Sequence, residues 1–291
     1  MGVRVHVVLY APDTATARAA ARAAYTRIVS LEDVMSDYRP SSELRRLSLQ
    51  SEEWVAVGPD LFAVLERALF IARATDGAYD PTLGPLTALW RDARSTGVVP
   101  PRTAIDAARA RTGPDKIRLD RARRSVRLGQ GVVLDLGGIA KGFILQQAMA
   151  VLQSHGIASA LLEAGGDVVV GAAPPGRDGW RIEAPTASPE VAARAASLAH
   201  SAIATSGPSE QFLLSEGVRY SHVVDPRTGL GVTGSSHATV IAADAATADA
   251  LATALTVLSP ARAAIVLASY PDVLASVDST TIRQPARTDR R

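Results

Sequence analysis

The chain contains no cysteine among its 291 residues. This absence excludes disulfide bonds, thiolate metal sites and cysteine nucleophiles, and we expect no cysteine-borne lipid anchor on the chain as given. Lysine is also scarce, because only Lys116 and Lys141 occur among 31 basic residues. A lysine at a chemically suggestive position therefore stands out against an arginine-rich background.

A strong charge imbalance and a long apolar run are absent too. The 31 basic residues nearly balance 29 acidic ones, so the formal charge is +2, too small to indicate a nucleic-acid or membrane surface. No apolar run is long enough to cross a bilayer, and the first residues alternate like a strand rather than forming a signal peptide. We expect a soluble protein without a membrane-spanning segment. As given it is expected to be cytoplasmic, or periplasmic or otherwise extracytoplasmic if a leader was removed.

The composition is that of a folded protein, with 47% hydrophobic residues. Helices are expected over 14–35, 61–75, 139–154 and 245–258, with a short one after Pro100-Pro101. Strands are expected over 3–9, 116–119, 125–128, 132–136, 168–170, 180–183, 203–205, 221–224 and 238–241, and around Leu161. This order predicts an α+β or mixed α/β fold. No repeat or linker divides the chain, so we expect one domain over 1–291 with a frayed tail from about 280.

The first chemically suggestive segment is a glycine turn over residues 134–142, with the sequence LDLGGIAKG. A predicted strand meets Gly137-Gly138, and the first turn of the next helix holds Lys141. Glycines allow close approach of a bulky anion, and the helix N-terminus offers unpaired amides to it. The segment equally fits a tight turn with a surface lysine, and its spacing is not that of a Walker loop.

The second segment is DAATADALATAL, over residues 244–255. Asp249 and Thr253 are four apart on a predicted helix, so their oxygens face the same way. Two hard oxygens suit Mg²⁺, which takes its remaining ligands from water and phosphate. The alternative is an ordinary capped helix, in which Asp244 is the N-cap, Asp249 is solvated and Thr253 bonds a carbonyl one turn back.

The third segment is YSHVVDPRTG, over residues 220–229, where His222 begins a predicted strand before a polar turn. A histidine in such a place is more often structural than catalytic, and the polar turn beside it is weak evidence for a catalytic role.

Taken in order, six segments resemble the ApbE family of FAD:protein FMN transferases, from the first strand to about Leu258. They are MSDYRPSSEL, DGAYDPTLGPL, LDLGGIAKG, EAGGDVVV, ATSG with YSHVVDPRTG, and DAATADALATAL. The resemblance implies a two-lobed, T-fold-like α+β architecture, with a mixed sheet, packed helices and FAD between the lobes. It also implies a flavinylation reaction, in which FMN moves from FAD to a Ser/Thr hydroxyl of a target flavoprotein and AMP is released.

The resemblance also implies the site residues. FAD, as substrate, would be lined by Met1, Tyr38, Ala78, Tyr79, Asp80, Asp135, Lys141 and His222. Mg²⁺ would take the carbonyl of Gly138 and the side chains of Asp249 and Thr253. His222 would accept or relay the proton of the acceptor hydroxyl.

The sequence departs from the family pattern in two places. Glu163-Ala164 precede Gly-Gly-Asp where asparagine is frequent, and residues 208–211 read PSEQ where an aromatic residue and an arginine are common. Three alternatives stay open: a Mg²⁺-dependent FAD pyrophosphatase that gives FMN and AMP, a non-catalytic FAD-binding protein, and a nucleotide-binding regulatory module.

Overall fold

The computed structural model describes residues 3–184, 187–207, 212–233, 236–278 and 280–282. Its helices are α1 (Thr14–Met35), α2 (Glu43–Ser48), α3 (Pro59–Ala74), α4 (Gly84–Thr96), α5 (Arg102–Arg109), α6 (Ala140–Ser154), α7 (Pro189–Ala195), α8 (Ala245–Leu255) and α9 (Pro260–Leu267), with a 3-10 turn at Pro114–Lys116. Its strands are β1 (Val5–Leu9), β2 (Trp54–Ala56), β3 (Ile117–Asp120), β4 (Ser125–Leu128), β5 (Ala160–Ala164), β6 (Asp167–Val170), β7 (Ser201–Ser206), β8 (Phe212–Ser215), β9 (Val218–Val224), β10 (Gly231–Thr233), β11 (Ala238–Ala242), β12 (Leu274–Val277) and β13 (Thr280–Thr281).

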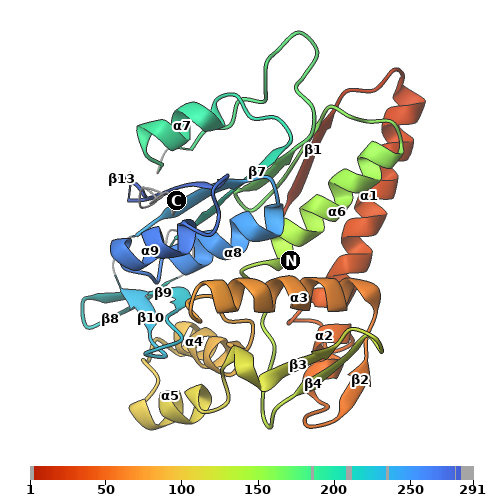
Figure 1. Cartoon of the computed structure of the whole chain (residues 1–291). Coiled ribbons are helices and arrows are strands. Elements are labelled where there is room, and N and C mark those ends of the chain that lie inside the picture. Colours follow the sequence, from red (N-terminus) through yellow and green to blue (C-terminus); the bar gives the residue numbers. More distant parts are fainter. Residues whose placement is uncertain (1–2, 185–186, 208–211, 234–235, 279, 283–291) are drawn as a thin grey trace, which may run out of the picture.

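A seven-stranded sheet forms the larger part of the molecule, in the order β1-β5-β6-β7-β11-β12-β13 (Figure 1). Every pairing in it is antiparallel, and β5 and β6 are joined by a two-residue turn, Gly165-Gly166. Both glycines have positive φ, +58° and +88°, which is the conformation that a tight hairpin of this length requires.

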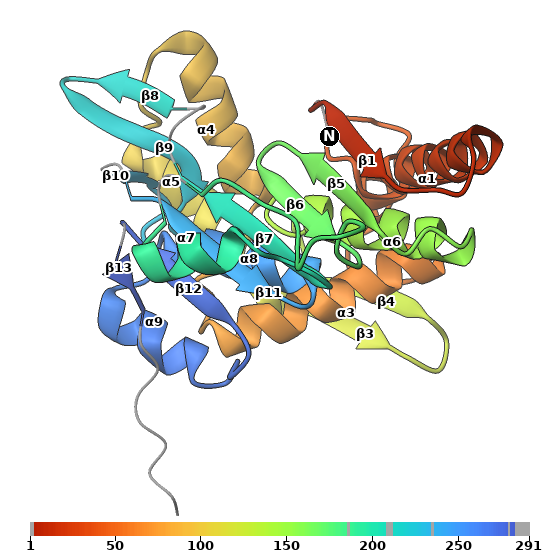
Figure 2. The same cartoon turned by 90° about the horizontal axis from the view of Figure 1, so that it is seen from above.

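The two faces of this sheet are covered by different elements, as the view from above shows (Figure 2). Helices α6 and α8 pack on one face, and α7 packs on the other. The strands alternate accordingly: Val169 of β6 joins the main core under α6 and α8, whereas its neighbours Val168 and Val170 join the cluster under α7. This period of two is the expected side-chain pattern of a strand that is buried on both faces.

A second part of the molecule lies below the large sheet in Figure 1. It holds two three-stranded antiparallel sheets, β2-β4-β3 and β10-β9-β8, together with α2, α4 and α5. Helix α3 contacts α8 and runs between the two parts, and α4 packs on β8 and β9. Trp90 of α4 anchors that contact, because its indole Nε1 donates to the carbonyl of Gly229 at 2.8 Å.

The α+β fold is confirmed, and so are the helices predicted over 14–35, 61–75, after Pro101 and over 139–154. The predicted strand over 132–136 is wrong: this stretch makes a single bridge, Val133 to Leu83, because the loop beside it supplies hydrogen bonds in place of a strand. The predicted strand over 180–183 is also wrong, and Trp180 makes one bridge to Leu198.

Other boundaries shift as well. The helix predicted to end at Leu258 ends at Leu255. At the expected start of the C-terminal tail, Thr280 and Thr281 pair with β12. Residues 283–291 lie outside the described residues. Within the described part of the chain, no helix is both long and apolar enough to span a bilayer.

Candidate functional site

Helix α8 is enclosed by the rest of the molecule. Every residue of α8 is buried except Thr253, and Asp249 is only 4% exposed. Asp244 caps the helix, accepting from the Thr247 amide at 2.7 Å, which agrees with the capped-helix alternative. The rest of that alternative does not hold, because Asp249 is buried rather than solvated. A buried carboxylate has to be paired or to bind a cation, since burying an isolated charge is costly.

The first partner of Asp249 is the main chain of α6. The Gly142 amide donates to Asp249 Oδ2 at 3.1 Å. The contact depends on glycine, because a Cβ atom at position 142 would lie 2.1 Å from the carbonyl oxygen of Ala245. The absence of a side chain therefore lets the first turns of α6 and α8 meet and brings the carboxylate to the glycine turn.

The second partner of Asp249 is Lys141, whose ammonium lies between two buried carboxylates. Lys141 Nζ is 3.0 Å from Asp249 Oδ1 and 2.6 Å from Asp167 Oδ2. Burial acts to lower the pKa of Lys141, but the charges of Asp249 and Asp167 outweigh it and raise the pKa. Burial, with the Asp249 charge adding to it, raises the pKa of Asp167 to about 7, despite the opposing effect of Lys141. One ammonium therefore does not neutralise this pair of carboxylates.

Thr253 lies against the main chain of the glycine turn. A Cβ atom on Gly138 would be 2.8 Å from Thr253 Oγ1, so the Thr253 side chain packs closely against the main chain of this glycine. The Thr253 hydroxyl makes no hydrogen bond to a carbonyl one turn back, or to any other described residue. The hydroxyl and the Gly138 main chain thus lie together, one turn of α8 from Asp249.

A buried loop carries Ala78, Tyr79 and Asp80 to the same region. The carbonyl of Pro81 accepts from the Asp135 amide at 2.8 Å, which joins this loop to the glycine turn. Asp135 in turn accepts from the Gly137 amide at 2.7 Å. Burial raises the pKa of Asp135, and the nearby charge of Asp37 adds to the effect.

Tyr79 is buried, and its hydroxyl has no hydrogen-bond partner among the described residues. Burial raises the pKa of Tyr79, and the charges of Asp249, Asp135 and Asp80 raise it further. The phenol therefore lies within the electrostatic reach of carboxylates from three separate segments. A buried hydroxyl without a partner is costly, and such a group is commonly satisfied when a ligand binds.

Asp80 is held by its own loop. Its Oδ1 accepts from the Thr82 amide at 2.8 Å and from the Thr82 hydroxyl at 2.6 Å. The Thr82 hydroxyl also accepts from the Gly113 amide at 2.7 Å. Burial raises the pKa of Asp80 above its ordinary value, and these hydrogen bonds only partly oppose the rise.

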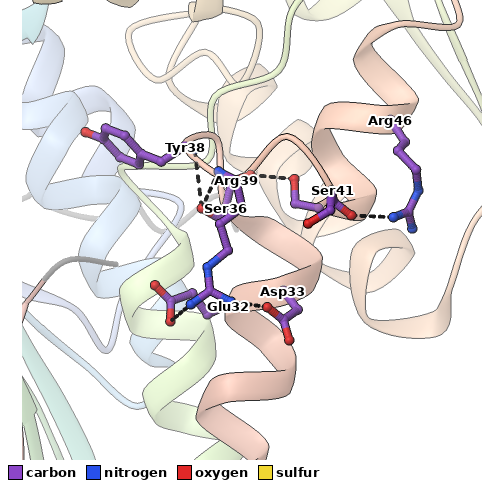
Figure 3. Close-up of polar contacts among 8 residues, drawn as sticks. Glu32, Asp33, Ser36, Tyr38, Arg39, Ser41 and Arg46 are labelled. Atoms are coloured by element: carbon purple, nitrogen blue, oxygen red, sulfur yellow. Dashed lines mark hydrogen bonds and ion pairs between the residues drawn. The ribbon is translucent and has the colours of Figure 1, made fainter.

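Tyr38 lies just beyond the C-terminus of α1, and its side chain is 66% exposed. The loop is fixed by the Ser36 hydroxyl, which accepts from the amides of Tyr38 and Arg39, and by Arg39, which folds back onto Glu32 and Asp33 (Figure 3). The phenol ring projects away from this network. The Arg91 guanidinium lies 4.3 Å from the ring centroid, so the ring has a cation on one side and stays largely open to a planar ligand.

His222 lies on β9 with an exposed side chain, between the buried residues Ser221 and Val223. The hairpin that carries it packs on α4 through Tyr220 and Trp90, whose rings are 5.2 Å apart. The strand expected from the sequence is confirmed, and its exposed position makes the imidazole accessible from outside the core.

The structure brings most of the predicted residues together in three adjoining sets. Lys141 and Asp249 are in direct contact, and Gly138 and Thr253 lie together one helical turn from Asp249. The loop of Ala78, Tyr79 and Asp80 is joined to Asp135. Tyr38 and His222 come from separate segments, and Met1 lies outside the described residues. Asp167 also belongs to this site, although the sequence segments suggested no role for it. Its signal was the Gly-Gly turn followed by an acid at the start of a buried strand.

Among the described residues, no three or more His, Cys, Asp and Glu side chains gather as a metal-binding cluster. The oxygen atoms near Asp249 are of mixed kind instead: carboxylates, a threonine hydroxyl and main-chain carbonyls. Donors of this kind suit a hard cation better than a soft metal.

The sequence model of the ApbE family matches residues 1–277. Two curated relatives named FAD:protein FMN transferase come from Treponema pallidum and Vibrio cholerae. The chain is 34% identical to the first, covering 93% of this chain and 79% of the relative. It is 35% identical to the second, covering 80% of this chain and 71% of the relative.

Solved structures agree with these relatives. A crystal structure of the ApbE protein of Thermotoga maritima superposes with a TM-score of 0.83 at 31% identity, covering 98% of this chain and 94% of that one. The flavin transferase ApbE of Vibrio cholerae gives a TM-score of 0.79 at 30% identity, covering 95% and 90%.

Proposed function

The chain belongs to the ApbE family, and on that premise we propose that it is a Mg²⁺-dependent FAD:protein FMN transferase. FMN would pass from FAD to a serine or threonine hydroxyl of a target flavoprotein, and AMP would be released. We propose one transferase domain over 1–291, since the family match extends over residues 1–277.

The observation that carries this proposal is the buried carboxylate of Asp249, one helical turn from Thr253, whose side chain packs against the main chain of Gly138. The donors at hand are the carboxylate of Asp249, the hydroxyl of Thr253 and the carbonyl of Gly138, all hard oxygens of the kind that Mg²⁺ takes. The surrounding charge supports a cation as well, because Lys141 faces two carboxylates and the pKa of Asp167 is raised. These residues fit Mg²⁺ with few protein ligands. When bound there, the cation would neutralise charge on the pyrophosphate of the substrate.

The remaining residues of the site would bind and orient FAD. The exposed ring of Tyr38 offers a stacking surface, and the unpartnered hydroxyl of Tyr79 offers a hydrogen-bond donor inside the molecule. Lys141, at the N-terminus of α6, adds positive charge where phosphate would approach the glycine turn. The backbone of Ala78, Asp80 and Asp135 would form the wall between them, and the flavin nucleotide would lie between the two parts of the molecule.

In the proposed transfer, the oxygen of the acceptor hydroxyl attacks the FMN phosphorus in line. A new phosphorus–oxygen bond forms to the target protein, the bond to the AMP oxygen breaks, and AMP leaves with the electron pair. The acceptor proton has to be removed, and His222 is our candidate to accept or relay it, because a histidine titrates near neutral pH. Positioning and electrostatics contribute most in such a transfer, since the protein forms no covalent bond of its own.

The test is to incubate the chain with FAD, Mg²⁺ and a flavoprotein acceptor or a Ser/Thr-containing acceptor peptide. Flavin fluorescence on a denaturing gel and AMP are followed together, with a metal-free control. We expect covalent flavin and AMP in equal amounts. Free FMN with AMP and no labelled protein would support a pyrophosphatase instead. Intact FAD after long incubation would contradict catalysis and leave only flavin binding.

A further inference from the structure

We infer that Asp167 is a positioning residue that holds Lys141 away from Asp249 when a divalent cation binds. The inference rests on the proposed function, because it takes Asp249 as a ligand of that cation. It concerns a residue for which the sequence segments suggested no role.

The need for such a residue follows from the hydrogen bonds of Asp249. Its Oδ2 accepts from the Gly142 amide at 3.1 Å, and its Oδ1 lies 3.0 Å from the Lys141 ammonium. Both oxygens are therefore engaged before any cation arrives. A cation that takes Oδ1 has to compete with the ammonium of a lysine side chain that is only 25% exposed, and this ammonium needs another anion when it is displaced.

Asp167 is placed to be that anion. Its Oδ2 is 2.6 Å from Lys141 Nζ, closer than the Asp249 oxygen, and its side chain is only 4% exposed. Lys141 can thus leave Asp249 by a small movement without losing a charged partner. Because the Lys141 ammonium contacts both buried carboxylates, it can move away from one of them and stay paired with the other.

The backbone fixes Asp167 independently of Lys141. Gly165-Gly166 make the two-residue turn that starts β6, and Ala164 and Asp167 are register partners across it. The backbone of Thr205 on β7 also donates to the Asp167 carboxylate. A carboxylate held by a tight hairpin and by a neighbouring strand is a fixed point, whereas the lysine side chain is flexible.

The change that tests this is Asp167→Asn, which keeps the size of the side chain and removes its charge. Lys141 would then pair with Asp249 alone and compete fully with the cation. We expect the dissociation constant for Mn²⁺, used as a probe in place of Mg²⁺, to rise at least tenfold in the protein without FAD. Electron paramagnetic resonance gives the concentration of free Mn²⁺ during the titration, so the dissociation constant does not depend on turnover.

Glu163→Gln is the matched control. Glu163 belongs to the same hairpin and accepts from the Gly166 amide at 3.0 Å, and its loss should leave Mn²⁺ affinity unchanged. Asp167→Glu keeps the charge and should retain most of the affinity. It also keeps the test informative if the asparagine variant folds poorly, which circular dichroism would reveal.

A double-mutant cycle with Lys141→Met separates this role from simple charge attraction. If Asp167 acts by holding Lys141, then Asp167→Asn should change Mn²⁺ affinity less than threefold once the lysine is gone. An equal loss in both backgrounds would overturn the inference, and so would unchanged affinity in Asp167→Asn alone. If the unmodified chain itself binds no Mn²⁺, the proposed metal site fails before Asp167 is tested.

Discussion

Gly142 of α6 and Ala245 of α8 are in main-chain contact, with no room for even a methyl group between them. This contact sets the distance between the two helices that carry Lys141 and Asp249. The geometry of the site is thus determined by a residue that has no side chain.

The first prediction is that Gly142→Ala damages the site through this contact. A methyl group would lie 2.1 Å from the Ala245 carbonyl oxygen, so the helices have to separate. Overpacking of this kind costs about 1–3 kcal/mol, more than the roughly 1 kcal/mol that alanine gains over glycine inside a helix. Urea unfolding should show the loss of stability, and Mn²⁺ titration a loss of affinity. Gly58→Ala, at the N-cap of α3, is the control, because the methyl group there would come no closer than 3.1 Å to its nearest neighbour, the Glu43 carboxylate. Unchanged stability and affinity in Gly142→Ala would contradict the packing argument.

The second prediction is that Asp249→Ala abolishes flavin transfer, because the cation loses its carboxylate. We expect at least a hundredfold loss of turnover at saturating FAD, the order of effect of removing a main electrostatic contact in a transition state. AMP release is measured over a range of Mg²⁺ concentrations. Asp272→Ala, an exposed aspartate outside the site, serves as the control and should behave like the unmodified chain. Full Mg²⁺-dependent activity in Asp249→Ala would show that the metal assignment is wrong.

The third prediction is that His222→Ala slows transfer and leaves FAD binding largely intact. General-base catalysis typically contributes 10²–10⁴-fold, so we expect a loss of roughly that order in the rate of protein labelling. FAD affinity is measured separately, by quenching of flavin fluorescence. His155→Ala, at the exposed end of α6, is the control. Transfer at the unmodified rate in His222→Ala would remove this residue from the mechanism.

The fourth prediction concerns the unpartnered hydroxyl of Tyr79. Tyr79→Phe removes a buried group that has no hydrogen-bond partner, so the ligand-free protein should be as stable as before or more stable by about 1 kcal/mol. FAD affinity should fall, since the donor offered to the ligand is lost. Thermal unfolding with and without FAD measures both effects. A variant that is less stable without FAD and binds FAD normally would mean that the hydroxyl has a structural partner instead.

The fifth prediction is a pH dependence that originates at Asp80. Its pKa is raised in the folded protein, mainly by burial, from an ordinary value of 3.8. The folded state therefore binds this proton more tightly than the unfolded chain does. The stability that Asp80 contributes is full below pH 3.8 and is lost as the pH rises through the folded pKa.

Asp80→Asn isolates this effect, because asparagine can still accept from Thr82 and cannot ionise. Relative to the unmodified chain, the variant should gain stability as the pH is raised from about 3.5 toward neutrality. Urea unfolding at a series of pH values gives this difference, and contributions of other groups cancel in it. A difference that does not vary with pH would mean that Asp80 ionises as it does in the unfolded chain.

Much of this site could be predicted from sequence, for reasons that are local. Lys141 follows a Gly-Gly turn at the start of a helix, and Asp249 and Thr253 share a helix face, so short-range rules bring their side chains to a defined place. The strands β3 and β4 and the long helix α1 likewise lie where the local sequence pattern predicts them.

The parts that could not be predicted depend on contacts between distant segments. Nothing local shows that Asp167 reaches Lys141, because they are 26 residues apart and meet only when β6 lies beside α6. The stretch over 132–136 is apolar like a strand, yet the loop through Gly84 lies against it, with the Gly84 amide donating to the Val133 carbonyl at 3.1 Å. Helix α4 is absent from the sequence prediction because it begins with Gly84 and Pro85, two residue types that are typical of turns.

The enclosure of α8 has a consequence for how ligands could reach the site. A helix packed on all sides exchanges its amide protons only through large openings of the fold, so we expect the Asp249 end of the site to be among the slowest-exchanging regions of the chain. We therefore expect motion that admits a nucleotide to come from more exposed segments, such as Tyr38 and the β8–β9 hairpin. The part of the site on α8 would then stay rigid. Adaptation to different acceptor proteins would depend on movement of the more exposed segments.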